Sequence, residues 1–123
     1  MERKARENLE AARLLLEGED PCPNSSISRA YYAAYHACWD AMVDAGHPVP
    51  EVRRSVRYFH HQTFPQEVCD AGVLDEQQAG DLDYLYNQRI KADYYEDDVT
   101  LEEARAALKV SEALVHRLLE EQP

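Results

Sequence analysis

The sequence predicts an all-α protein, an antiparallel bundle of four main helices plus one short helix, in a single domain over residues 1–123. Three observations predict this fold. Residues 24–46 contain no proline and carry apolar side chains at intervals of three and four residues, which is the periodicity of a helix. Two further periodic segments, 76–91 and 101–120, each follow a residue suited to helix capping. No strand pattern or internal repeat is found, and 123 residues are the length of one domain.

The first two helices are predicted at residues 2–17 and 24–46. The first carries a stripe of alanine and leucine, and Gly18 stops it. The second begins at Asn24 or Ser25 as the capping residue and ends at Gly46. Its apolar or aromatic side chains extend nearly all the way round, which is typical of a helix buried on more than one side. We therefore place it at the centre of the bundle, partly covered by a second chain or another partner.

The remaining helices follow two proline-containing connectors. Residues 51–64 are expected to be helical, with Pro65 interrupting the helix before one more turn at residues 66–71. Asp75 is expected to cap the helix at 76–91. Thr100 begins a capping box, with Glu103 at the third helical position, for the last helix.

Composition excludes several classes of function. The formal net charge of −11 argues against a broad nucleic-acid-binding surface, although local basic patches remain compatible with it. The three cysteines are widely spaced and form no CxxC pair, so neither a metal site nor a disulfide framework is expected. No nucleotide-cofactor or catalytic-triad motif is present, and we expect no cofactor. The sequence contains neither a membrane-length apolar segment nor a secretory signal, which predicts a cytoplasmic protein without membrane contact.

The first candidate site is formed by Arg89, Asp93 and Tyr94. On a helix, Arg89 and Asp93 share a face and can pair. One interpretation is a structural ion pair that closes the helix end. The functional interpretation makes Arg89 a clamp for a phosphate group, oriented by Asp93, with Tyr94 as a stacking or hydroxyl group.

Two further groups are candidates for ligand binding. Arg54 with His60 or His61 could bind a phosphodiester and move a proton near neutral pH, or could form an ordinary solvated basic face. On the long helix, one face carries Arg29, Tyr32 and His36. These residues form either a ligand-binding face or a polar layer within the bundle, in which Asp93 or an acidic residue of the last helices would pair with a buried Arg29. The eight tyrosines favour a protein–protein face.

Two segments resemble one known family. SSISRAYYAAYHA (residues 25–37) resembles the long-helix signature of the HEPN superfamily, the higher-eukaryote and prokaryote nucleotide-binding domains. LYNQRIKADYYEDDVTLEEARAALKVSEALV (residues 85–115) resembles the later portion of that family. The resemblance implies a dimeric helical bundle, often paired with a small nucleotidyltransferase as toxin and antitoxin. Many members are metal-independent ribonucleases with an Arg-x(4–6)-His motif. Here that window after Arg89 ends on Tyr94, Tyr95 and Glu96, so no histidine carries over.

The sequence therefore supports one main functional hypothesis and two alternatives. The main one is a HEPN module that dimerises, pairs with a nucleotidyltransferase-like partner, and binds nucleotide or RNA phosphate in a cleft around Arg29, Arg89 and Asp93. The first alternative is a metal-independent RNase toxin with a non-standard site, in which Arg89 acts with His60, His61 or Tyr94. The second is a purely structural partner protein.

Overall fold

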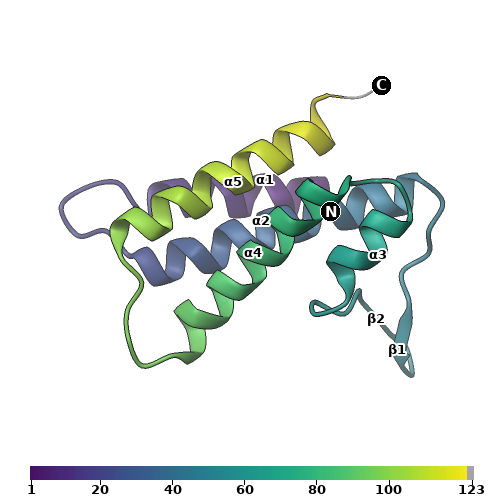
Figure 1. The fold of residues 1–123 in the computed structure, drawn as a ribbon, viewed down its shortest axis with the longest axis horizontal. Coiled ribbons are helices and arrows are strands. Elements are labelled where there is room, and N and C mark those ends of the chain that lie inside the picture. The colour runs from purple at the N-terminus through teal and green to yellow at the C-terminus, as the bar shows by residue number, and fades with distance from the viewer. Residues whose placement is uncertain (122–123) are drawn as a thin grey trace.

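The computed structural model describes residues 1–121, which contain five helices and two short strands (Figure 1). Helices α1 and α4 run opposite to α2 and α5, and the short helix α3 packs on α4. The predicted fold class is thus confirmed. Within the described residues, no helix is long and apolar enough to cross a membrane. The elements are α1 (Glu2–Leu14), α2 (Pro23–Asp44), β1 (Glu51–Arg53), β2 (Val56–Arg57), α3 (Phe64–Asp70), α4 (Glu76–Tyr94) and α5 (Leu101–Leu119).

Helix α2 lies at the centre of the bundle and contacts α1, α4 and α5. Its buried alanines allow these helices to pack closely, because a methyl side chain takes little space between two helix axes. Two buried serines tie the helices together. The Ser26 hydroxyl donates to the Ala12 carbonyl of α1 at 2.7 Å, and the Ser111 hydroxyl of α5 donates to the Ala30 carbonyl at 2.6 Å. The nearly all-round apolar surface of α2 therefore has the central position that its pattern predicts.

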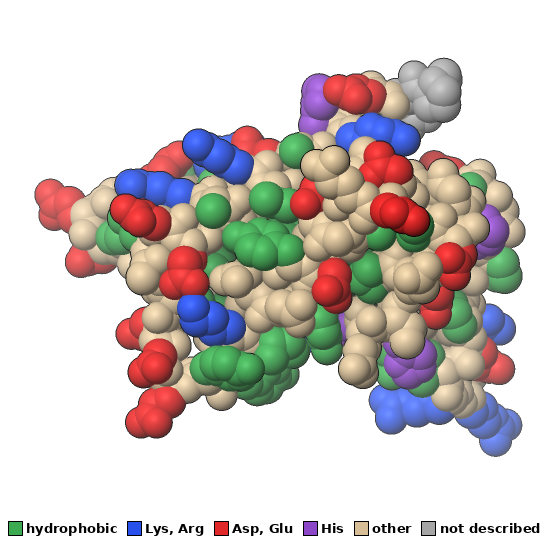
Figure 2. Space-filling view, viewed as in Figure 1, with side chains coloured by type: hydrophobic (Ala, Val, Ile, Leu, Met, Phe, Trp, Pro, Cys, Tyr) green, Lys and Arg blue, Asp and Glu red, His purple; other side chains and the backbone are tan. Residues whose placement is uncertain are grey.

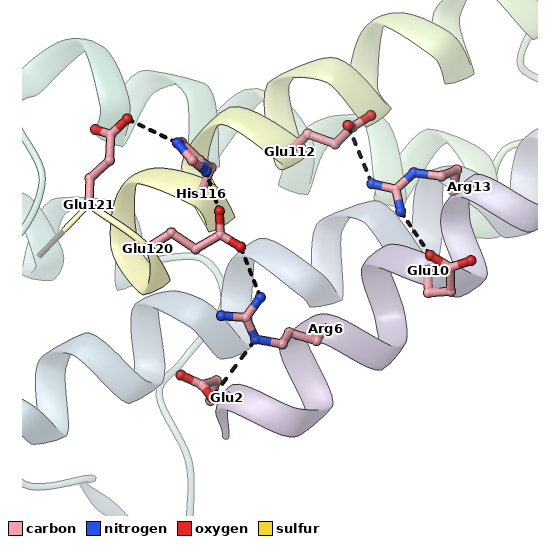
Figure 3. Close-up of polar contacts among 8 residues, drawn as sticks. All are labelled: Glu2, Arg6, Glu10, Arg13, Glu112, His116, Glu120 and Glu121. Carbon is pink, nitrogen blue, oxygen red and sulfur yellow. Dashed lines mark hydrogen bonds and ion pairs between the residues drawn. The ribbon is translucent and has the colours of Figure 1, made fainter.

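Ion pairs join the outer faces of α1 and α5 (Figure 3). Arg6 lies between Glu2 of its own helix, at 3.8 Å, and Glu120, at 3.1 Å. Arg13 contacts Glu112 of α5 at 3.4 Å. Because all of these side chains are more than 40% exposed, each pair contributes about 0–1 kcal/mol. Their main effect is to align the two helices.

The helix ends partly correct the sequence prediction. Asp75 and Thr100 form the predicted caps, each within a capping box. By contrast, α1 ends at Leu14 rather than at residue 17. Helix α2 begins after Cys22, with Pro23 in its first turn, so neither Asn24 nor Ser25 is the capping residue.

The Asn24 side chain has a different role from the predicted cap. Its Oδ1 accepts from the Val99 backbone N–H at 3.0 Å, and its Nδ2 donates to Asp98 at 2.9 Å. Asn24 therefore ties the start of α2 to the loop between α4 and α5. This contact spans more than seventy residues, so local sequence could not indicate it.

The predicted helix over residues 51–64 is wrong. β1 and β2 form an antiparallel hairpin instead, which projects from the bundle (Figure 1). Ser55 has a φ of +65° at the tip, a left-handed conformation that a tight turn needs and a helix excludes. Pro65 does not interrupt a helix either. It lies in the first turn of α3, where its missing N–H has no helical partner to lose.

Candidate functional site

Arg89 is the most enclosed cation of the predicted site. Its side chain is 14% exposed, and its Nε lies 3.0 Å from Oδ2 of Asp93, so the predicted pair is formed. The Nε–H does not point at this oxygen, and within residues 1–121 the buried Nε makes no aligned hydrogen bond. The contact is therefore an ion pair by distance. The guanidinium carbon lies 5.4 Å from the centre of the Tyr32 ring and 5.5 Å from that of Tyr94, which is cation–π range.

A hollow of about 470 Å³ opens beside this pair, and we call it the Arg29 hollow. Arg89 contacts two of its walls, Tyr32 and Asp93. The Ser28 hydroxyl donates to Oδ2 of Asp93 at 3.2 Å, so this carboxylate is held from α2 as well as from α4. The hollow is lined by Leu15, Ser25, Ser28, Arg29, Tyr32 and Asp93.

Arg29 was expected to be buried and paired with an acidic residue if it formed a polar layer of the bundle, and the structure differs from this. Arg29 is exposed rather than buried, and its guanidinium donates to the Asn8 side chain of α1 at 3.2 Å. Asp93 pairs with Arg89 instead. Arg29 therefore faces the hollow as a cation without a carboxylate partner among residues 1–121.

His61 packs against Tyr31, Tyr35 and Tyr86, and we call these four residues the aromatic cluster. The imidazole centre lies 4.4 Å from that of the Tyr35 ring and 6.2 Å from that of Tyr86, to which it is nearly parallel. The Tyr31 hydroxyl lies 2.5 Å from Nδ1 of His61. The Tyr35 hydroxyl donates to the backbone carbonyl of Phe59 at 2.7 Å and so anchors the segment that carries the histidine.

The electrostatics of the cluster keep His61 neutral. Burial lowers the pKa of His61, and the positive charges of Arg89 and then His60 lower it further. Burial also raises the pKa of Tyr31 far above its ordinary value, so its hydroxyl stays protonated beside Nδ1. The Tyr32 ring lies between the two groups, with its centre 5.8 Å from that of His61 and 5.4 Å from the guanidinium carbon of Arg89, so the cluster and the Arg89–Asp93 pair are neighbours.

His36 is also held neutral. It lies half-buried between the rings of Tyr32 and Trp39. Burial, followed by the charge of Lys4, lowers the pKa of His36 to about 4. As a ligand-binding residue it would therefore act near neutral pH as an uncharged hydrogen-bonding group.

The other predicted site residues lie in more exposed positions than Arg89 and His61. His60 is exposed, with its ring 5.4 Å from that of Tyr58, so it does not share the enclosure of its neighbour His61. Arg54 lies on the hairpin and does not line the Arg29 hollow. Tyr94 is 69% exposed, although its ring faces Arg89.

Sequence reasoning missed three residues of this region, namely Ser28, Tyr31 and Tyr86. Tyr86 precedes Arg89 by three positions, and this helical spacing could have indicated a shared face. Ser28 and Tyr31 had no comparable local signal, because their partners Asp93 and His61 are distant in sequence.

The arrangement brings an enclosed guanidinium, an exposed guanidinium and a neutral imidazole to one side of α2. Guanidinium groups bind phosphate oxygens through paired N–H donors, and the tyrosine rings offer faces on which a base can stack. Within residues 1–121, no group of three or more histidine, cysteine or acidic side chains is placed to hold a metal ion.

Comparisons with known proteins agree with this architecture. The sequence model of the HEPN domain matches residues 2–122. A protein of Methanocaldococcus jannaschii named "Putative toxin MJ0605" is 32% identical over 114 residues, which cover 93% of this chain and 80% of that protein.

Proposed function

Because the chain belongs to the HEPN domain family, we propose that it is a toxin-type module that binds the phosphate of RNA or of a nucleotide. The binding site is the Arg29 hollow with Arg89 and Asp93. The observation that carries this proposal is the placement of Arg89, which is 14% exposed, paired with a single carboxylate and flanked by two tyrosine rings.

The enclosure of Arg89 supports phosphate binding in two ways. A guanidinium that is partly removed from water interacts more strongly with an anion than one on an open surface. Asp93, held by the Ser28 hydroxyl, keeps a negative charge 3.0 Å from Nε of Arg89 and so attracts the guanidinium to this position before a ligand arrives. Arg29 lines the hollow and adds a second positive group to the proposed site.

The proposal includes a homodimer and a nucleotidyltransferase-like partner in the cytoplasm. The toxin name of the M. jannaschii relative supports a toxin–antitoxin pairing. The exposed rings of Tyr94 and Tyr95, at 69% and 64%, offer an aromatic surface at the end of α4 for such contacts.

Binding of single-stranded RNA to the purified, partner-free protein tests the proposal. Loss of one charge-assisted phosphate contact typically costs about 1.5–3 kcal/mol, so Arg89→Ala should weaken binding roughly 10- to 100-fold. Arg105→Ala is the matched control, because Arg105 is an exposed arginine of α5 without an ion pair among residues 1–121. If both variants bind RNA equally well, the Arg89 site is not the binding site.

A second candidate function, a metal-independent RNase, is favoured by the position of His61. The neutral ring of His61 could accept the proton of a 2′-hydroxyl as that hydroxyl attacks the adjacent phosphorus. The imidazolium formed in this way could then give the proton to the 5′-oxygen that leaves. Arg89 would stabilise the charge on the phosphate during this step.

Incubation with RNA in the presence of a chelator separates the two functions. If the enzyme hypothesis holds, His61→Asn and Arg89→Ala should both abolish cleavage while the fold, checked by circular dichroism, stays intact. If the well-folded wild-type dimer binds RNA but does not cleave it, the enzyme hypothesis is wrong and the binding function remains.

A further inference from the structure

The β-hairpin concentrates positive charge on an otherwise acidic molecule. Residues 51–57, which we call the basic hairpin, contain Arg53, Arg54 and Arg57 against a single glutamate, in a chain with a net charge of −11. Figure 1 shows that the hairpin projects from the bundle. Lys and Arg side chains gather at this end of the molecule, with a histidine beside them (Figure 2).

The arginines at the tip are free to contact a ligand. Arg53 and Arg54 are exposed, and neither forms an ion pair within residues 1–121. Arg57 contacts Glu51 only at 3.9 Å, and its guanidinium also donates to the Val49 carbonyl at 3.2 Å. Two arginines of α1 differ, because Arg6 and Arg13 each lie between two glutamates (Figure 3).

The hairpin backbone holds these side chains in a defined arrangement. Glu51 is paired with Arg57, and Arg53 with Val56, across the two strands. The Ser55 N–H donates to the Glu51 side chain at 3.3 Å across the turn. The closed turn therefore carries two consecutive, exposed arginines, Arg53 and Arg54.

The chain leads directly from the basic hairpin to the aromatic cluster. The rings of Tyr58 and His60, whose centres are 5.4 Å apart, follow the last hairpin arginine. His61 comes next and packs against Tyr35 and Tyr86. A group of arginines is thus followed by a run of aromatic rings along one connected segment from the hairpin tip toward Arg89. Positive groups and rings also occur together in surfaces that follow a single nucleic-acid strand.

We propose that the basic hairpin is a second phosphate-contact site, which holds single-stranded RNA extending from the Arg29 hollow. The inference rests on the proposed function, since it concerns the same RNA. A strongly acidic protein repels a polyanion unless the electrostatic potential is positive where the strand binds. Because salt screens charges more than about 8 Å away, a projecting group of arginines can make the potential positive at the hairpin. The paired N–H donors of arginine match the oxygens of a phosphate group. The nearby rings favour a single strand over a duplex, because unpaired bases can stack on them.

An acidic protein surface is the competing occupant. Residues 96–98 of a second copy, Glu-Asp-Asp, would supply such a surface. The exposed or half-buried rings of Tyr58 and His60 directly after the arginines favour RNA, because a purely acidic partner would need only the charges. The experiment below therefore measures RNA affinity and oligomeric state in the same samples.

The test compares two double variants with the same change in charge. Arg53→Gln/Arg54→Gln removes the tip charges, and Arg105→Gln/Lys109→Gln removes two exposed charges from α5. Binding of a labelled, mixed-sequence single-stranded RNA of about 16 nucleotides is followed by fluorescence anisotropy over a range of salt concentrations. The hairpin variant should bind roughly tenfold more weakly at low salt, and its salt slope should fall by about 1.4, or 0.7 for each lost phosphate contact. The α5 variant should stay within about twofold of wild type.

Other results would overturn the inference in distinguishable ways. Equal affinities of the two double variants, with Arg89→Ala still impaired, would refute the hairpin site and leave the proposed function intact. Absence of RNA binding by the wild-type protein would refute both. Unchanged RNA affinity with a lower oligomeric state of the hairpin variant, measured by light scattering, would assign the hairpin to contact between copies.

Discussion

Replacing Tyr35 with phenylalanine tests how the His61 segment is held on the bundle. Tyr35 is 3% exposed, and its hydroxyl donates to the Phe59 carbonyl at 2.7 Å. The variant keeps the ring, which packs against His61 and Phe64, and removes only the oxygen atom. Among residues 1–121, no other donor bonds to this carbonyl, and Phe59 is only 2% exposed. The effect should therefore come from one lost hydrogen bond.

The expected cost follows from the burial of both partners. A typical buried hydrogen bond contributes about 1 kcal/mol net, and leaving its acceptor unsatisfied costs about 1–3 kcal/mol. Since folding of the variant no longer requires desolvation of a hydroxyl, we expect the free energy of unfolding to fall by about 1–2 kcal/mol. For a chain of this length, this corresponds to a decrease in Tm of roughly 4–10 °C.

Urea unfolding followed by circular dichroism measures this change, at one fixed protein concentration because association alters apparent stability. The matched control is Tyr95→Phe, since Tyr95 is 64% exposed and its hydroxyl makes no hydrogen bond within residues 1–121. The control should lie within about 0.5 kcal/mol of wild type. If Tyr35→Phe is no less stable than the control, the hydrogen bond does not anchor residues 58–63 and the account of how His61 is positioned is wrong.

Two further predictions concern the histidines. Burial lowers the pKa of His36 to about 4 from 6.5, so between these values the unfolded chain binds a proton that the folded one does not, and stability should fall as the pH drops from 6.5 to 4. The full shift corresponds to about 3 kcal/mol, reduced by solvent screening of a half-buried side chain to roughly 1–2 kcal/mol. Urea unfolding of His36→Gln should show a smaller loss over this window, and an identical pH dependence would contradict the prediction. Arg89→Gln should raise the pKa of His61 because it removes a nearby positive charge, and an NMR titration of the imidazole that finds no change would show that the two groups are not neighbours.

The helical part of the fold was predictable because its signals are local. The period of apolar residues and the capping boxes at Asp75 and Thr100 act within a few positions of the chain. Residues 51–64 were misassigned for the same reason, since their valines and Phe59 also fit a helical period. What excludes a helix there is the left-handed turn at Ser55, together with the burial of Phe59 against Phe64, at a ring distance of 4.5 Å.

The candidate site also has one part that local sequence predicts and one part that it does not. The sequence by itself determined the Arg89–Asp93 pair, because four residues on a helix bring two side chains to one face. Only the tertiary structure decided between His60 and His61, which are adjacent in the chain and alike in chemistry. The extended segment turns one of them to solvent and the other under Tyr31 and Tyr86, where burial and the charge of Arg89 lower its pKa. That choice depends on how α2 and α4 pack, which no local pattern specifies.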